Sequence, residues 1–215
     1  MQNAAMRCTV VMAILAMTAA QGLAVYQYNN GATHTITGAH SDYVLVDYNK
    51  PGMNTTVVFE PGSAVTGDYD LNGYQDCLII LNGGILNHDL NAYNNTEVTL
   101  QGGSINHILY ARDNSVVNLY GGTVGTISLL GDSEMLVYGV SYALNGTPVD
   151  PGQTLQMPDA AITLSVTFAD GNTMDYEILF SPGQNVVTLM IPEPATFGLL
   201  AFGGLTLLKR RRAIR

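Results

Sequence analysis

The sequence predicts an all-β fold: a single-stranded parallel β-helix, a solenoid of about five turns with roughly 18–22 residues each, followed by a C-terminal β cap. The first observation is an internal repeat, because glycine pairs recur at positions 83–84, 102–103 and 121–122, with a spacing of 19 residues. Residues 83–101 and 102–120 share nine of 19 positions. A unit this short cannot bury its own apolar face, so successive units are expected to stack.

The second observation is an alternation of apolar residues within each repeat. Val98 and Leu100 in one unit correspond to Val117 and Leu119 in the next. Alternation with a period of two indicates a strand with one buried face, and stacked strands lie about 4.8 Å apart. We therefore assign residues 25–139 to the β-helix repeats.

A column of Asp and Asn residues is the third observation. Such residues tolerate left-handed backbone geometry, so the column predicts a corner in each turn. In the following column Cys77 stands where the other repeats have Thr or Ser, and we interpret it as a small turn residue. The predicted β-helix resembles the passenger domains of autotransporters, and its handedness stays open. The corner column consists of Asp76, Asn95, Asn114 and Asp132.

The repeat stops at Val140. Three turn signals follow between alternating stretches, at 145–146 (Asn-Gly), 151–152 (Pro-Gly) and 170–171 (Asp-Gly). Because a solenoid exposes its last turn, residues 140–190 are predicted to form a β-rich cap and a linker.

Charge is distributed unevenly. Residues 25–190, called the body below, contain 16 acidic residues but only two basic ones, Lys50 and Arg112, which gives a net charge of −14. Nucleic-acid affinity comes mainly from Lys and Arg, so this composition excludes nucleic acid as a partner. A polysaccharide lyase would need a basic residue as its proton acceptor, and an acidic body would repel an anionic polymer.

The two ends have the composition of targeting segments. Residues 1–24 combine Arg7, an apolar run over 9–20 and small residues at Gly22 and Ala24, which predicts a secretory signal peptide with a helical core. An uncleaved membrane anchor and a buried helix are the alternatives. Near the C-terminus, the apolar residues 195–208 would span roughly 21 Å as a helix, less than the roughly 30 Å of hydrocarbon. The basic cluster after them predicts a cytoplasmic tail and an external body.

The C-terminal motif has three parts in order: Pro192-Glu193-Pro194, the apolar stretch 195–208, and the basic cluster Lys209, Arg210, Arg211 and Arg212. It resembles the PEP-CTERM sorting signal of Gram-negative bacteria, a domain also labelled an ice-binding protein C-terminal domain. For residues 191–215 the resemblance implies a transmembrane helix over 195–208 as a transient anchor and processing by an exosortase, while the signal peptide in residues 1–24 predicts Sec-type export. The protein would pass through an inner-membrane intermediate to the cell surface or the exopolysaccharide matrix.

Four oxygen-bearing side chains have the spacing of a calcium loop: Asp68, Asp70, Asn72 and Asp76. The segment resembles an EF-hand loop and a dockerin half-site. However, Ile79 stands where the twelfth position would supply a carboxylate, and residues 70–76 are also the repeat copy of 89–95. The sequence thus leaves open a calcium site and a purely structural turn.

Two further columns carry chemistry. His88 and His107 would stack about 5 Å apart and could hold zinc or copper, but no third ligand is evident from the sequence. Tyr74, Tyr93 and Arg112 would permit ring stacking and a cation–π contact, and the same row could bind sugar rings. A solvated histidine ladder and structural stacking are the alternatives.

These observations predict an exported, non-enzymatic surface or matrix protein without a cofactor. No hydroxyl, thiol or carboxylate stands with an identifiable base and orienting group, so no catalytic residue is assigned. The alternatives are a carbohydrate-binding module that uses the Tyr74 and Tyr93 face, which would make exopolysaccharide a partner, and a polysaccharide-degrading β-helix enzyme.

Overall fold

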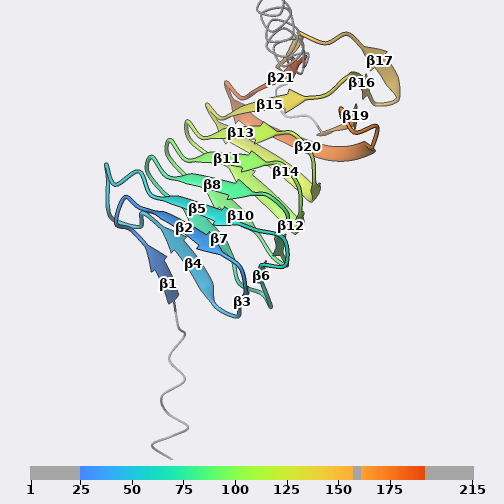
Figure 1. The fold of residues 1–215 in the computed structure, drawn as a ribbon. Coiled ribbons are helices and arrows are strands. Elements are labelled where there is room, and N and C mark those ends of the chain that lie inside the picture. Colours follow the sequence, from blue (N-terminus) through green and yellow to red (C-terminus); the bar gives the residue numbers. More distant parts are fainter. Residues whose placement is uncertain (1–24, 157–160, 192–215) are drawn as a thin grey trace, which may run out of the picture.

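The computed structural model describes residues 25–156 and 161–191, and in these ranges it is all-β, with no helix. The strands stack into a β-solenoid that is covered at its C-terminal end (Figure 1). In chain order they are β1 (Val25–Tyr28), β2 (Thr33–Ile36), β3 (Ala39–His40), β4 (Tyr43–Val46), β5 (Thr56–Phe59), β6 (Ala64–Val65), β7 (Leu71–Gly73), β8 (Leu78–Leu81), β9 (Ile85–Leu86), β10 (Leu90–Ala92), β11 (Glu97–Leu100), β12 (Ser104–Ala111), β13 (Val116–Leu119), β14 (Thr123–Gly131), β15 (Glu134–Tyr138), β16 (Ser141–Leu144), β17 (Thr147–Val149), β18 (Thr154–Leu155), β19 (Ala161–Thr167), β20 (Thr173–Gly183) and β21 (Val186–Met190).

Two sheets of parallel strands form the walls of the solenoid. One contains β1, β4, β7, β10, β12, β14 and β20 as successive neighbours, and the other contains β2, β5, β8, β11, β13, β15 and β21. A shorter row of β3, β6 and β9 joins the first sheet at β12. The predicted parallel stacking is therefore confirmed.

The strand register follows the sequence repeat. Val98 in β11 lies opposite Ile79 in β8 and Val117 in β13, each 19 residues away along the chain. Earlier turns are longer, because Thr56 pairs with Leu78. The alternation also holds, since the inward-facing residues of this sheet are fully buried in one continuous apolar core: Val57, Phe59, Ile79, Leu81, Val98, Leu100, Val117, Leu119, Met135, Val137, Val187 and Leu189.

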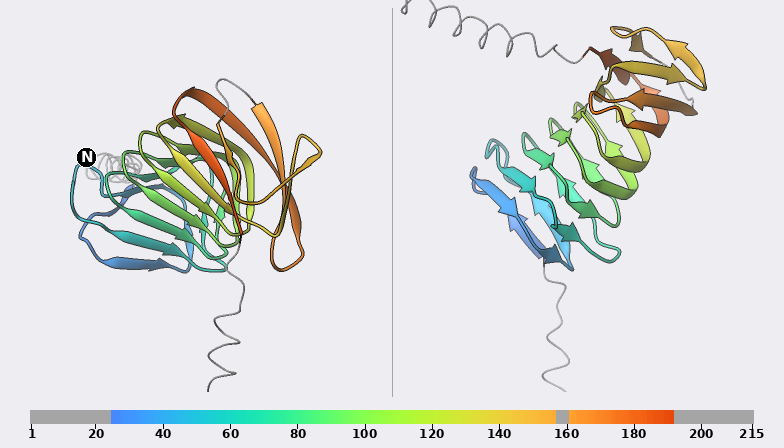
Figure 2. Two further views of the ribbon diagram at one scale, coloured as in Figure 1. Left: turned by 90° about the horizontal axis from the view of Figure 1, so that it is seen from above. Right: turned by 45° about the vertical axis from the view of Figure 1, so that its right-hand side comes forward.

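The solenoid has about six turns, more than the five predicted, because residues 173–190 rejoin the stack as its last turn. Strand β20 pairs in parallel with β14, and β21 pairs in parallel with β15. The chain between these turns makes the cap: β19 pairs antiparallel with β20, and β18 pairs antiparallel with β21. Both views in Figure 2 show these strands at the C-terminal end of the stack.

The predicted corner is present, but the left-handed residue is one position earlier than expected. Positive φ angles occur at Gln75, Asn94 and Asp113, and at Gly131 in the next turn. The predicted Asp and Asn column, one residue later, instead forms side-chain hydrogen bonds between turns. The Asn95 side-chain amide donates to Asp76 at 2.9 Å. Next to it a buried column of small polar residues faces inward: Thr55, Cys77, Thr96, Ser115 and Ser133.

The predicted signal helix in residues 1–24 and the transmembrane helix over 195–208 lie outside the described residues. Within the described part of the chain, no helix has the length and apolarity that crossing a bilayer requires.

Candidate functional site

Two histidines and two aspartates form a ladder on the outer surface of the solenoid. His88 lies between β9 and β10, and His107 lies in β12, where the register with β14 shifts between Ile105 and Ile108. Because Leu86 pairs with Ile105 and Leu90 with Leu109, the two histidines occupy equivalent places in consecutive turns. Their rings stack with centroids 4.9 Å apart and an interplanar angle of 26°.

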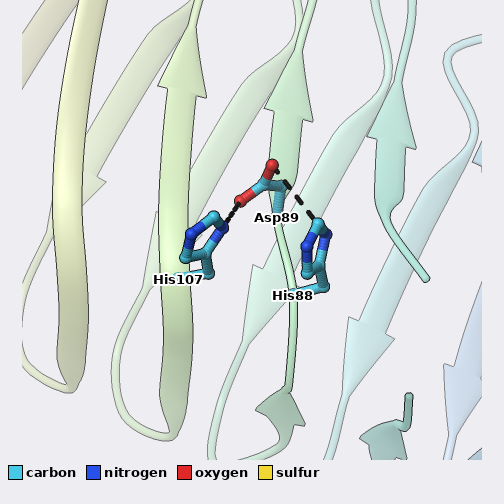
Figure 3. Close-up of side chains that lie close together, drawn as sticks. All are labelled: His88, Asp89 and His107. Atoms are coloured by element: carbon cyan, nitrogen blue, oxygen red, sulfur yellow. Dashed lines mark hydrogen bonds and ion pairs between the residues drawn. The ribbon is translucent and has the colours of Figure 1, made fainter. Parts of the chain in front are cut away.

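Each imidazole contacts a carboxylate of the preceding turn. His107 Nδ1 lies 2.6 Å from Asp89 Oδ1, and His88 Nδ1 lies 2.6 Å from Asp70 Oδ1. Asp89 reaches both rings, since its Oδ2 is 3.9 Å from His88 Nδ1, and Figure 3 shows its carboxylate between the two histidines. The order along the stack is Asp70, His88, Asp89, His107, and we call these four residues the His–Asp ladder.

Asp89 is the most restrained member of the ladder. Its side chain is 14 % exposed, whereas that of His107 is 53 % exposed. The backbone N–H of Ile108 donates to Asp89 Oδ1 at 3.0 Å, which fixes the carboxylate from the neighbouring turn. The ladder therefore presents partly exposed imidazoles beside a carboxylate that a backbone N–H holds in place.

The electrostatics of the ladder favour the protonated form of His88. The hydrogen bond to Asp70 raises the pKa of His88 above its ordinary value, and the negative charges of Asp89, Asp70 and Asp68 act in the same direction. Desolvation acts in the opposite direction and is the smaller effect. This part of the surface consequently attracts positive charge.

Sequence reasoning placed the two histidines together but missed a third ligand. The structure supplies it, because ligand atoms of His88, Asp89 and His107 all lie within 4.8 Å of one another. Both short contacts join residues 18 apart rather than 19. When the repeats are aligned with an offset of 19 residues, Asp89 falls opposite Ile108. The alignment therefore does not indicate the contact between Asp89 and His107.

The predicted aromatic column also exists and is longer than expected. Tyr74 and Tyr93 stack with centroids 4.9 Å apart and an angle of 4° between the rings. Tyr48 meets Tyr74 edge-on at 5.1 Å. The Arg112 guanidinium carbon lies 5.5 Å from the Tyr93 centroid and 4.6 Å from that of Tyr110. The row runs across four turns, and we call these five residues the aromatic ladder.

This geometry bears on sugar binding. A sugar ring that stacks on an aromatic residue needs a free ring face, but Tyr93 has Tyr74 on one face and Arg112 within cation–π range. The stacking also partly buries the rings, and burial raises the pKa of Tyr74 above its ordinary value. The aromatic ladder therefore stabilises the contacts between turns, and the ring faces that stack on one another are not open to a sugar.

The proposed calcium residues have separate partners in the structure. Asp70 contacts His88, and Asp76 accepts a hydrogen bond from Asn95. Asn72 lies within β7 and is only 8 % exposed, so the segment is interrupted by a strand rather than forming one continuous loop. In the described part of the chain, Asp68, Asp70 and Asp76 do not form a carboxylate group close enough to hold one ion, and calcium binding stays a prediction.

Cys77 is fully buried beneath the corner, and its Sγ lies 3.5 Å from the Thr96 hydroxyl. Burial raises the pKa of the thiol to about 11, so it is almost entirely un-ionised at neutral pH. A nucleophilic role for this thiol is therefore unsupported.

The predicted sorting motif lies outside the described residues. It consists of Pro192, Glu193, Pro194 and Lys209 to Arg212.

Comparisons with known proteins give no match: no family model, no curated protein and no solved structure matches this chain.

Proposed function

We propose that this protein is a non-enzymatic component of the cell surface or exopolysaccharide matrix of a Gram-negative bacterium. The sequence of its C-terminus carries the proposal: Pro192-Glu193-Pro194, an apolar stretch and a basic cluster follow one another at the terminus. The resemblance of this segment to a PEP-CTERM sorting signal implies a transient membrane anchor that an exosortase recognises. The N-terminal segment 1–24 would direct the chain to Sec-type export.

The body has features that suit a structural role outside the cell. Its turns are joined by repeated side-chain contacts, namely the aromatic ladder, the His–Asp ladder and the amide contacts along the corner. Its net charge of −14 favours solubility and disfavours association with anionic polymers. A stiff acidic rod is well suited to act as a spacer or matrix element.

The environment of the basic side chains supports a non-enzymatic function. A lyase would need a basic side chain free to accept a proton, but the Arg112 guanidinium packs against Tyr93 and Tyr110. Lys50 is exposed on the loop between β4 and β5, and its backbone N–H donates to the Asp47 carbonyl oxygen at 3.1 Å. Neither residue resembles a pre-organised catalytic base.

Mass spectrometry of the mature protein in its host, combined with cell fractionation, tests the proposal. We expect an N-terminus at or near Val25 and the loss of the basic tail in material from the surface or matrix. Replacing Arg210, Arg211 and Arg212 by Gln should leave the protein in the cell envelope with its tail intact, whereas replacing exposed Lys50 by Gln is a matched control that should be processed normally. Cytosolic protein with both ends intact would contradict the proposal.

Carbohydrate binding is a second candidate function. Tyr48, at the end of the aromatic ladder, is 43 % exposed, and its ring is T-shaped to that of Tyr74 rather than stacked on it, which favours access of a sugar to Tyr48 over the stacked rings. Glycan-array binding that is lost in Tyr48→Ala but kept in Tyr120→Ala, which is similarly exposed, would support this role. Absence of binding to every glycan would remove it.

A further inference from the structure

We propose that His88, Asp89 and His107 bind one divalent transition-metal ion of the Zn²⁺ or Cu²⁺ class on the outer surface of the solenoid. Their ligand atoms all lie within 4.8 Å of one another, and two successive turns contribute them. This inference does not depend on the proposed export and sorting, so either can fail without the other.

The chemistry of the donor set selects the ion. Two imidazole nitrogens and a carboxylate oxygen suit zinc and copper, whereas Ca²⁺ and Mg²⁺ prefer shells made of oxygen alone. Asp70, whose Oδ1 lies 2.6 Å from His88 Nδ1, could supply a fourth ligand. With two carboxylates the site would neutralise a divalent cation, within a body of net charge −14.

The distances are close to those that coordination requires. With bonds of about 2.0–2.1 Å, two ligand atoms on a tetrahedral ion lie roughly 3.3 Å apart. Asp89 Oδ1 is 2.6 Å from His107 Nδ1 and Asp89 Oδ2 is 3.9 Å from His88 Nδ1, so each imidazole lies within about 1 Å of the required separation from an oxygen of the same carboxylate. An ion at this place would replace the proton between His107 Nδ1 and Asp89 Oδ1.

The two imidazoles must approach each other, and the structure leaves room for that movement. The side chain of His107 is 53 % exposed and that of His88 is 34 % exposed, while the second side-chain torsion of histidine is soft. Asp89 need not move, because the N–H of Ile108 already holds its carboxylate. Bound metal would thus link the turn that contains β10 to the turn that contains β12.

Calorimetric titration of the purified full chain with ZnCl₂, in detergent because of the apolar C-terminal stretch, tests the site. We expect one Zn²⁺ per chain, and at least about a tenfold loss of affinity in His107→Ala and in Asp89→Asn. His34→Ala is the matched control, since His34 contacts Asn30 rather than a carboxylate, and its affinity should be unchanged. Circular dichroism of each variant verifies the fold.

A second measurement separates these ligands from adventitious ones. Electron paramagnetic resonance of the Cu²⁺-loaded chain should show coupling to two imidazole nitrogens, and to only one in His107→Ala. Absence of zinc binding at about 1 mM ZnCl₂ would overturn the proposal. A dissociation constant above that concentration is too weak for a pre-organised metal site. Unchanged zinc affinity in a folded His88→Ala, His107→Ala double variant would overturn it as well.

Discussion

The Tyr176 hydroxyl of β20 donates a hydrogen bond to the Gly122 carbonyl oxygen at 2.6 Å, across 54 residues of sequence. The Tyr176 side chain is fully buried, and its ring meets that of Phe168 edge-on at 6.3 Å. This contact fastens the last turn of the solenoid to the turn before it. The cap is therefore joined to the repeat by a buried polar contact in addition to strand pairing.

We expect Tyr176→Phe to lower the free energy of unfolding by about 1–2 kcal/mol, because the ring stays in place while the Gly122 carbonyl loses its donor. Urea denaturation followed by circular dichroism measures the change. Tyr48→Phe is the control, since Tyr48 is 43 % exposed and its change should stay within about 0.5 kcal/mol. Equal effects of the two substitutions would show that the hydroxyl of Tyr176 does not fasten the last turn.

Gly103 lies where the backbones of two successive turns leave no room for a side chain. It has a φ of +79°, and a Cβ at this position would lie 2.2 Å from the Gly84 carbonyl oxygen. Gly152 has a similar φ of +83° but open space around it. We expect Gly103→Ala to cost at least about 2 kcal/mol more in unfolding free energy than Gly152→Ala, because only the first forces backbone apart. Equal midpoints in urea would contradict the tight contact.

The aromatic ladder should stabilise the stack unequally along its length. Tyr93 has ring contacts with both Tyr74 and Arg112, whereas among the described aromatic contacts Tyr48 has one, with Tyr74. We expect Tyr93→Ala to lower the melting temperature more than Tyr48→Ala, with an additional loss of about 1 kcal/mol from the extra stacking and cation–π contacts. Thermal melts monitored by circular dichroism compare the two, and a larger effect at Tyr48 would contradict this reading.

The repeat could be predicted from the sequence because every turn needs the same types of residue at the same positions. The inward residues must be apolar at alternate positions, and glycine pairs at 102–103 and 121–122 allow backbone to approach backbone. The last turn was missed because residues 139–172 separate β15 from β20, and the buried Asn185 replaces the small polar residue of the earlier corners. Asn185 donates to the Leu129 carbonyl oxygen, a contact that no periodicity in the sequence indicates.

The candidate site was predictable only in part. A shared column placed His88 beside His107, as the structure confirms. Their carboxylate partners follow from side-chain reach, because each ring extends back toward the residue one position later in the preceding turn. The left-handed corner residue is likewise shifted by one position from the predicted column. Asn94 adopts the positive φ, while the side-chain amide of Asn95 donates a hydrogen bond to the adjacent turn.

Cys77 makes the free energy of unfolding depend on pH in the alkaline range. Burial raises the pKa of its thiol from about 9 to about 11, so between these values the unfolded chain loses the proton while the folded chain keeps it. Because the unfolded state then binds fewer protons, the free energy of unfolding decreases as pH rises through this window, by roughly 2–3 kcal/mol in total. Below pH 9 the thiol contributes no pH dependence.

Cys77→Ser removes this contribution, and Ser already occupies the same corner column at positions 115 and 133. We expect the stability difference between the natural chain and Cys77→Ser to shift by about 2 kcal/mol in favour of the variant between pH 8 and pH 11. Urea denaturation at the two pH values measures it. Buried tyrosines such as Tyr176, whose pKa burial also raises, affect both proteins equally and cancel. An unchanged difference at the two pH values would show that the thiol is accessible to water in the folded protein.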